Sequence, residues 1–253
     1  MTLPIGELAA AALILAAAYA VYGLTGFGSS VVAIPLLALF LPLKFAVTLV
    51  MLLDFVAGSA LLTKHHRSVR FRELLLMVPF MGLGILAGVY LLVNLPERPL
   101  ILALGVFVVS YAIFALTHRS GIPRLGRVWG ALLSTLGGVL AALYNIGGVL
   151  WAVYTTSRIA DKDHLRATTA ATLWISVLPR LGLYANAGLL QESELWIITA
   201  LLIAPTLIGY YVGQLLHSRL SPERFLTLVS MVLIASGCAL ILRATTGLPE
   251  VAP

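Results

Sequence analysis

Eight long apolar stretches, joined by short loops that hold most of the basic residues, limit what this chain can fold into. The chain is 60% hydrophobic and only 10% charged, whereas about a quarter of the residues in a soluble domain are charged. A water-soluble fold of this composition could not cover its surface with polar groups, so the sequence predicts an all-α integral membrane protein. The stretches cover residues 7–40, 44–63, 73–93, 99–117, 128–157, 167–190, 195–216 and 225–242.

The net charge of +6 does not indicate a nucleic-acid partner. The basic residues are spread over short loops between apolar stretches, as membrane topology requires, and do not form one phosphate-binding face. The single cysteine, Cys238, excludes an intrachain disulfide. No cleavable signal peptide is expected, because the N-terminus lacks a basic region and the first apolar stretch is too long.

Two of the eight stretches are too long to be single membrane helices. Residues 7–40 would form a helix of roughly 51 Å, although the hydrocarbon core of a bilayer is only about 30 Å thick. Residues 128–157 have the same excess. Glycine and polar residues interrupt both stretches, at 23–30 and at 144–148, and glycine disfavours continued helix. Each long stretch is therefore predicted to be two half-helices joined by a break.

Small motifs recur along the chain at a nearly constant offset, which predicts an internal duplication. Gly84-x-x-x-Gly88 recurs as Gly209-x-x-x-Gly213, and each pair precedes a Pro-Glu-Arg triplet. Such glycine pairs are common where membrane helices pack closely, so the duplication is inferred from the offset that the motifs share. The predicted first repeat is 1–120, with hairpin 7–40 and helices 44–63, 73–93 and 99–117; the second is 121–253, with hairpin 128–157 and helices 167–190, 195–216 and 225–242.

The distribution of lysine and arginine predicts the orientation. If both long stretches are re-entrant hairpins, the loops 64–72, 119–127, 158–166 and 219–224 share one face and hold twelve of the 16 basic residues. If both stretches cross the membrane, the split is nine to seven. The sharper bias favours hairpins, cytoplasmic basic loops and outside termini. The two repeats are then inverted, and secondary transporters with inverted repeats bind substrate among discontinuous helices.

The two breaks are predicted to form an anion site. The N-terminus of each second half-helix presents free N–H groups and the positive end of a helix dipole, and nearby hydroxyl and amide groups add donors. Such a site needs no fully buried cation. The alternative is that the glycines only allow close packing. The predicted site residues are Thr25, Gly26, Phe27, Gly28, Ser29, Ser30, Tyr144, Asn145, Ile146, Gly147 and Gly148.

The same residues carry a family resemblance. The run Gly23-Leu24-Thr25-Gly26-Phe27-Gly28, with Pro35 seven residues later, resembles the first half of the sulfite exporter TauE/SafE family, and Asn145-Ile146-Gly147-Gly148 resembles its repeat partner. The resemblance extends over almost the whole chain. It implies a multi-pass permease of the bacterial cytoplasmic membrane that exports sulfur-containing anions such as sulfite, sulfoacetate or other organosulfonates. Ser29-Ser30 and Tyr154 depart from the pattern.

Four further polar residues are candidates for the transport path or for coupling. Asp54 is the carboxylate well inside a predicted span, where ionisable groups are functional candidates by default; it either exchanges protons or pairs with a basic residue. Arg180, near the outer end of its stretch, either attracts the anion or extends to the interface. Thr48 and Thr169, at matching repeat positions, either line the path or bond their own backbone.

The remaining alternatives differ in class. An aspartyl membrane protease needs two membrane aspartates and a zinc protease an HExxH motif; neither set is present, so no enzyme, cofactor or metal is predicted. A passive anion channel, or a permease for another small carboxylate or oxyanion, would need the same residues and stays open. Membrane lipid is the expected solvent, and the oligomeric state is open between monomer and homodimer.

Overall fold

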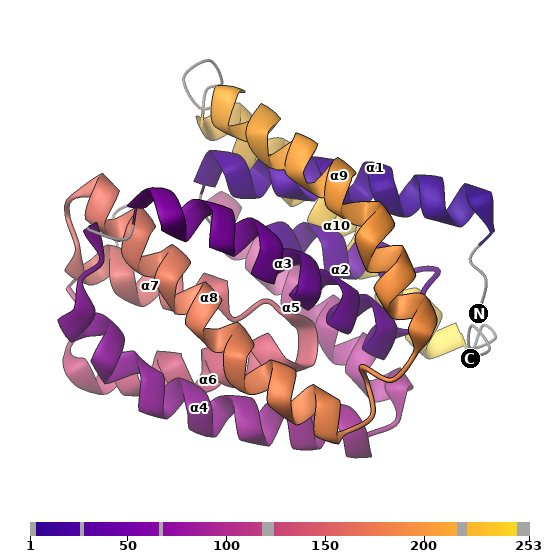
Figure 1. The fold of residues 1–253 in the computed structure, drawn as a ribbon, viewed down its shortest axis with the longest axis horizontal. Helices are drawn as coiled ribbons and strands as arrows, with labels where there is room; N and C mark the ends of the chain where they lie inside the picture. Colours follow the sequence, from indigo (N-terminus) through magenta and orange to yellow (C-terminus); the bar gives the residue numbers. More distant parts are fainter. Residues whose placement is uncertain (1–3, 26–27, 66–67, 118–123, 217–221, 247–253) are drawn as a thin grey trace.

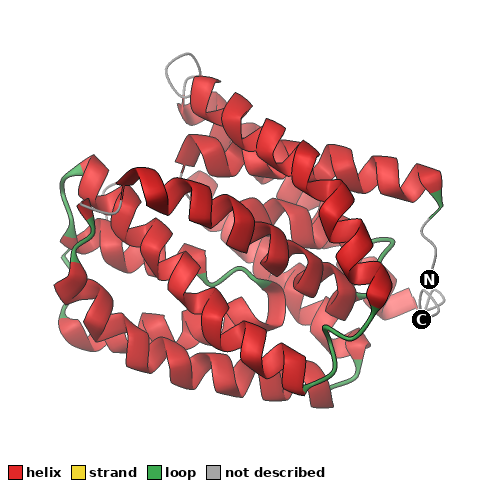
Figure 2. Cartoon of the chain, in the orientation of Figure 1, coloured by secondary structure: helices red, strands yellow, loops and turns green. Residues whose placement is uncertain are grey.

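Within the part of the chain that the structure describes, ten α-helices form and no strand occurs (Figure 2). The computed structural model describes residues 4–25, 28–65, 68–117, 124–216 and 222–246, without the side chains of 25, 60–65, 162–163, 166 and 222–228. The helices are α1 (Ile5–Thr25), α2 (Ser29–Leu37), α3 (Leu43–His65), α4 (Phe71–Asn94), α5 (Glu97–Thr117), α6 (Arg127–Tyr144), α7 (Gly148–Arg158), α8 (Lys162–Asn186), α9 (Ser193–Leu216) and α10 (Pro222–Thr246).

Six of these helices are long and apolar enough over their described residues to cross a membrane. Their outer faces are covered with large apolar side chains, and Leu13, Leu83 and Leu215 are each more than half exposed. A soluble protein could not expose such surfaces without aggregating. The six segments are Ile5–Leu24, Phe71–Asn94, Glu97–Thr117, Arg127–Tyr144, Ser193–Leu216 and Val229–Thr246.

Glycines bring the outer helices together in pairs. A Cβ atom on Gly84 of α4 would lie 2.0 Å from the Thr135 carbonyl oxygen of α6, so only glycine allows these backbones to approach so closely. A Cβ atom on Gly209 of α9 would lie 2.1 Å from the Ala16 carbonyl oxygen of α1. The two glycine pairs identified in the sequence are therefore packing glycines. In Figure 1, α1 and α9 lie along one edge, α4 and α6 along the opposite edge, and α3 and α8 cross between them.

Both predicted helix breaks are present. The first separates α1 from α2 after Thr25, and the second separates α6 from α7 at residues 145–147. The second break lies among the helices, as the short central loop of Figure 2 shows. The chain turns back after this break. A Cβ atom on Gly130, near the start of α6, would lie 2.6 Å from the ring of Tyr154, near the end of α7, so these two helix ends lie side by side. The second long stretch is thus a broken hairpin. An inverted repeat stays a prediction.

Hydrogen bonds join the helix ends into two groups. At one end, Glu97 accepts a bond from the Leu43 backbone N–H (2.7 Å), and Arg98 donates to the Ala244 carbonyl (2.7 Å). At the other end, Tyr154 donates to Glu73 (2.8 Å), and Arg158 forms an ion pair with the same carboxylate (3.3 Å). The described parts of the basic loops 64–72 and 158–166 thus lie at one end of the molecule, as the charge distribution predicts.

We expect this basic end to face the cytoplasm. In a Cys238→Ala background, single cysteines at Ser68 and Ala160 should not react with a membrane-impermeant thiol reagent in intact cells, and should react after the cells are opened. A cysteine at the exposed Glu192, in the turn between α8 and α9, is the matched control and should react in intact cells. Labelling of Ser68→Cys or Ala160→Cys from outside would contradict the orientation.

Candidate functional site

Asp54 lies on α3 at the centre of a cluster of four hydrogen-bond donors from three other segments. Its Oδ1 accepts bonds from the Tyr19 hydroxyl of α1 (2.6 Å) and the Ser29 hydroxyl of α2 (3.1 Å). Its Oδ2 accepts bonds from the Ser30 hydroxyl (3.0 Å) and the Asn145 side-chain amide (2.7 Å). A carboxylate offers about four acceptor positions, and these four donors fill them. The geometry therefore suits an ionised carboxylate.

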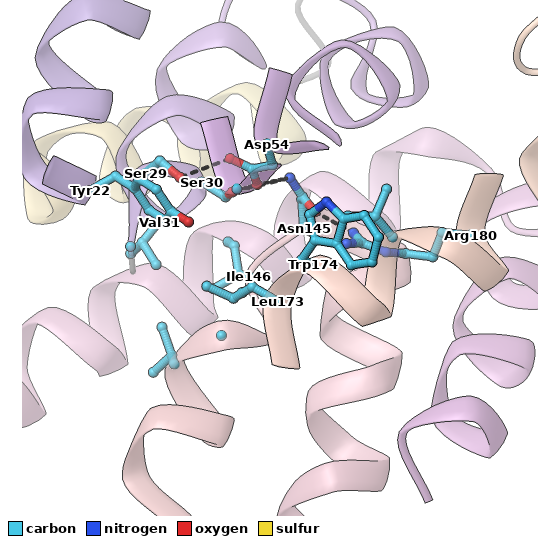
Figure 3. Close-up of a pocket in the computed structure, with 15 residues that line it drawn as sticks. Tyr22, Ser29, Ser30, Val31, Asp54, Asn145, Ile146, Leu173, Trp174 and Arg180 are labelled. Atoms are coloured by element: carbon cyan, nitrogen blue, oxygen red, sulfur yellow. Dashed lines mark hydrogen bonds between the residues drawn. The ribbon is translucent and has the colours of Figure 1, made fainter. Parts of the chain in front are cut away.

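Asn145 connects this carboxylate to a buried cation. The residue caps the end of α6 in a left-handed conformation (φ 58°), which asparagine tolerates better than most residues. Its amide nitrogen donates to Asp54, and its amide oxygen accepts a bond from the guanidinium of Arg180 on α8. The amide is oriented as both charges favour, because its donor faces the carboxylate and its acceptor faces the guanidinium. Figure 3 shows these three side chains in a row.

Arg180 is only 2% exposed, although it carries a full positive charge. Its guanidinium also donates to the Ser176 carbonyl (3.0 Å), the Ser176 hydroxyl (3.0 Å) and the Ala141 carbonyl (2.9 Å). Together with the bond to Asn145, four of its five N–H groups are satisfied. Within the described part of the chain it contacts no carboxylate directly, so the charges of Asp54 and Arg180 balance each other through Asn145.

The helix breaks place a suitable dipole end beside each charge. Ser29 and Ser30 form the first turn of α2, so Asp54 faces the positive end of that helix. Arg180 donates to Ala141, one of the last carbonyls of α6, and so lies at the negative end of that helix. Helix ends stabilise charges of the opposite sign within one turn. Each buried charge is therefore stabilised by the helix end beside it.

A narrow cavity lies beside this network, between the two breaks. Its volume is ≈ 20 Å³, which is room for about one or two water molecules. One wall is polar and holds the network from Ser29 to Arg180. The rest of the lining, called the aromatic wall here, is apolar and aromatic and includes Tyr22, Leu173, Trp174 and Val177. The cavity is therefore amphipathic, and in this conformation too small for an organic anion.

The aromatic wall is held in place by specific contacts. The Trp174 indole N–H donates to the Ser59 hydroxyl (2.8 Å), and its ring stacks on Phe55 at a centroid distance of 5.7 Å. A Cβ atom on Gly58 would lie 3.3 Å from Trp174, so a side chain there would press on the ring. Gly58 thus lets Trp174 lie close to α3, one helical turn from Asp54.

The structure brings together most of the residues predicted around the breaks. Gly28, Ser29, Ser30, Asn145, Ile146 and Gly148 all line the cavity, and so do Asp54 and Arg180. Tyr144 and Gly147 do not line the cavity. The Tyr144 hydroxyl donates to the Leu100 carbonyl (3.0 Å). A Cβ atom on Gly147 would lie 2.2 Å from the Gly137 carbonyl oxygen. Gly147 is a packing residue between α7 and α6.

The remaining predicted residues are not placed at the cavity. Gly26, Phe27 and the side chain of Thr25 lie outside the described residues. The Thr48 hydroxyl donates to the Lys44 carbonyl one turn earlier (2.8 Å), which is the self-bonding alternative. The Thr169 hydroxyl shares a hydrogen bond with Thr155 of α7 (3.0 Å) and is buried away from the cavity.

The burial of Arg180 decides between its two predicted positions. The side chain lies buried on the cavity wall, so it does not extend to the membrane interface, and attraction of the anion stays a prediction. The site predicted from the sequence needs no fully buried cation, and the structure places one on its wall. Tyr19, Tyr22 and Trp174 were not predicted as site residues. For the two tyrosines, the available signal was their position three residues apart on the helix just before the first break, which places them on one face.

Comparison with known proteins agrees with this architecture. The family described as "Sulfite exporter TauE/SafE" matches residues 10–240. The chain belongs to the TauE/SafE family. A relative is the "Probable inner membrane transporter protein TsaS" of Comamonas testosteroni, which is 26% identical over 196 residues, 76% of this chain and 81% of the relative. No solved structure matches the chain.

Family membership and the apolar helices together establish the class of protein. TauE/SafE proteins are transporters, so this chain is a transporter and not an enzyme. The name of its relative describes a probable inner membrane transporter, and six helices among this chain's described residues are long and apolar enough to span a bilayer. It is therefore a multi-pass transporter of the inner membrane, and the cavity between its helix breaks is the candidate site.

Proposed function

We propose that this protein is a secondary transporter that exports small sulfur-containing anions, organosulfonates above all, and binds them between the two helix breaks. The observation that carries the proposal is the buried Arg180 guanidinium, held beside donors from both breaks on the wall of one cavity. A buried cation that shares one cavity lining with hydroxyl and amide donors favours an anion over a neutral or cationic substrate.

The shape of the cavity favours an organic anion. An oxyanion head can meet Arg180, Asn145 and the hydroxyls, while an attached carbon group lies against Tyr22 and Trp174. Sulfite has no carbon group and would leave the aromatic wall uncovered. The family description names sulfite export, and a sulfonate carries a similar sulfur oxyanion as its head group. Because the cavity also has an aromatic wall, we rank sulfonates above sulfite as substrates.

The small cavity supports a carrier over a passive channel. A channel needs a continuous water-filled path, whereas this cavity of ≈ 20 Å³ has room for about one or two water molecules. A substrate can enter only if the helices or Trp174 move. We infer that the two halves are inverted repeats that rock about the site. The equivalent glycine contacts, α4 on α6 and α9 on α1, support this because each joins a helix of one half to the hairpin of the other.

A panel of anions tests the proposed substrate class. Purified protein is titrated with methanesulfonate, sulfoacetate, sulfite, thiosulfate and acetate, and its melting temperature is measured, because a ligand that binds the folded state raises that temperature with concentration. We expect the sulfonates to stabilise most and acetate least. Stabilisation by acetate but by none of the sulfur anions would favour the carboxylate permease instead. Saturable uptake of the best ligand into vesicles then separates a carrier from a channel.

A substitution at the first break tests the position of the site. Gly28 has φ +94°, and a Cβ atom there would meet one atom at 4.0 Å, so a side chain has space but a strained backbone. Gly28→Leu should fill the cavity and weaken methanesulfonate binding at least tenfold. Gly82→Leu on α4, where nothing lies within 4 Å of the Cβ position, is the matched control. Equal affinity in Gly28→Leu and the control would place the site elsewhere.

A further inference from the structure

The donors available to a substrate anion are already used by Asp54. Its carboxylate accepts bonds from Tyr19, Ser29, Ser30 and Asn145. Two of these, Ser30 and Asn145, line the cavity from opposite breaks, and Ser29 lies on the same wall. A substrate oxyanion between the breaks would need these donors. The carboxylate and the substrate are therefore competitors for one set of hydrogen bonds.

Charge leads to the same competition. With Asp54 ionised, the network of Asp54, Asn145 and Arg180 has no net charge. A substrate anion would then add an uncompensated negative charge beside a carboxylate in a site that holds little water. Burying an unpaired charge in such a place is strongly unfavourable. If Asp54 carries a proton, Arg180 and the substrate anion balance each other.

We propose that Asp54 is a proton-binding site linked to the anion site, so that each monoanion binds together with one proton. The inference rests on the proposed function. A proton from the side on which the substrate enters binds one Asp54 oxygen, which becomes a hydroxyl donor. The hydrogen bonds from Ser30 and Asn145 pass from the carboxylate to the substrate. On the opposite side of the membrane the anion and the proton leave together, an electroneutral step that the outward concentration gradient of the anion drives, and the Asp54 carboxylate again accepts hydrogen bonds from its four donors.

The other groups around Asp54 are less suited to take up the proton. Tyr19 of α1 is its nearest titratable neighbour and already donates to it. Tyr22 of α1 lines the cavity, and behind it Tyr210 of α9 contacts its ring. Arg180 of α8 stays charged in proteins. The described residues of α2, α6 and α7 on the cavity wall are uncharged, so Asp54 is the carboxyl group among the described lining residues.

The test counts protons during anion binding. Methanesulfonate is the probe because a sulfonate stays ionised at every pH used, so that any pH dependence belongs to the protein. Calorimetric titrations in buffers with different enthalpies of ionisation give the number of protons taken up per anion. We expect about one proton at a pH where free Asp54 is ionised, and an affinity that falls about tenfold per pH unit there. Asp54→Asn should take up none and bind independently of pH.

The outcomes separate the inference from the proposed function. The exposed carboxylate variant Glu192→Gln should retain the proton uptake of the parent. Methanesulfonate binding by the parent without proton uptake and without pH dependence overturns the inference and leaves the proposed function intact. Failure of every sulfur anion in the panel to bind the parent overturns both. The proton count uses the unaltered protein, so it decides the matter even if Asp54→Asn does not fold.

Discussion

Replacing Arg180 with methionine should lower the free energy of unfolding by about 3–5 kcal/mol and abolish methanesulfonate binding. Methionine matches the length of the side-chain stem but removes the guanidinium. The substitution leaves Asp54 without its opposite charge, and it leaves Asn145 and the Ala141 carbonyl without a donor they now have. The stability is measured by unfolding the purified protein in mixed micelles that contain increasing amounts of a denaturing detergent, and calorimetry measures the binding.

A double variant separates charge imbalance from lost packing. Asp54→Asn in the Arg180→Met background removes the uncompensated carboxylate, so it should recover much of the lost stability but none of the binding. Coupled sites of this kind are non-additive by about 0.5–3 kcal/mol. Arg124→Met, at an exposed position before α6, is the matched control and should change neither property. Simple additivity of the Arg180 and Asp54 effects would mean that Asn145 does not couple the two charges.

The element order was predictable because the membrane imposes it. Apolar stretches of about 20 residues or more can satisfy their backbone groups in lipid only as helices, and the sequence contains eight of them. The excess length of 7–40 and 128–157 required a break in each, and the polar-glycine runs showed where. The structure places the breaks at those runs, with α2 beginning at Ser29 and α7 at Gly148. Local chemistry determines these features.

The network at the site was only partly predictable because it depends on distant parts of the chain. Asp54 and Asn145 are 91 residues apart, and Asn145 and Arg180 are 35 apart. Each was a candidate by itself, but no sequence pattern shows that one asparagine bridges the other two. The position of Arg180 in the chain also suggested an interface, since a long cationic side chain near a helix end can reach water. Its burial follows from how α8 packs against the end of α6.

Removing the Asn145 side chain should weaken methanesulfonate binding by about 1–3 kcal/mol, the loss expected for a hydrogen bond to a charged group. The variant must preserve the backbone, because Asn145 has a φ of 58° and ends α6 in the left-handed region. Asn145→Gly keeps this conformation and removes the amide, so it isolates the bridge between Asp54 and Arg180. A calorimetric Kd in parent and variant measures the effect.

Asn145→Ala separates the bridge from the backbone. Alanine removes the same amide but adds the strain of a left-handed residue, roughly 1–2 kcal/mol. The alanine variant should therefore be less stable than the glycine variant, while both lose the same binding energy. Gly188→Ala, at φ +79° in the turn after α8 and away from the cavity, measures the strain of a similar backbone position without touching the network. If Asn145→Gly binds as tightly as the parent, the amide does not hold the anion, and the substrate is bound by Arg180 and the hydroxyl groups without help from the second break.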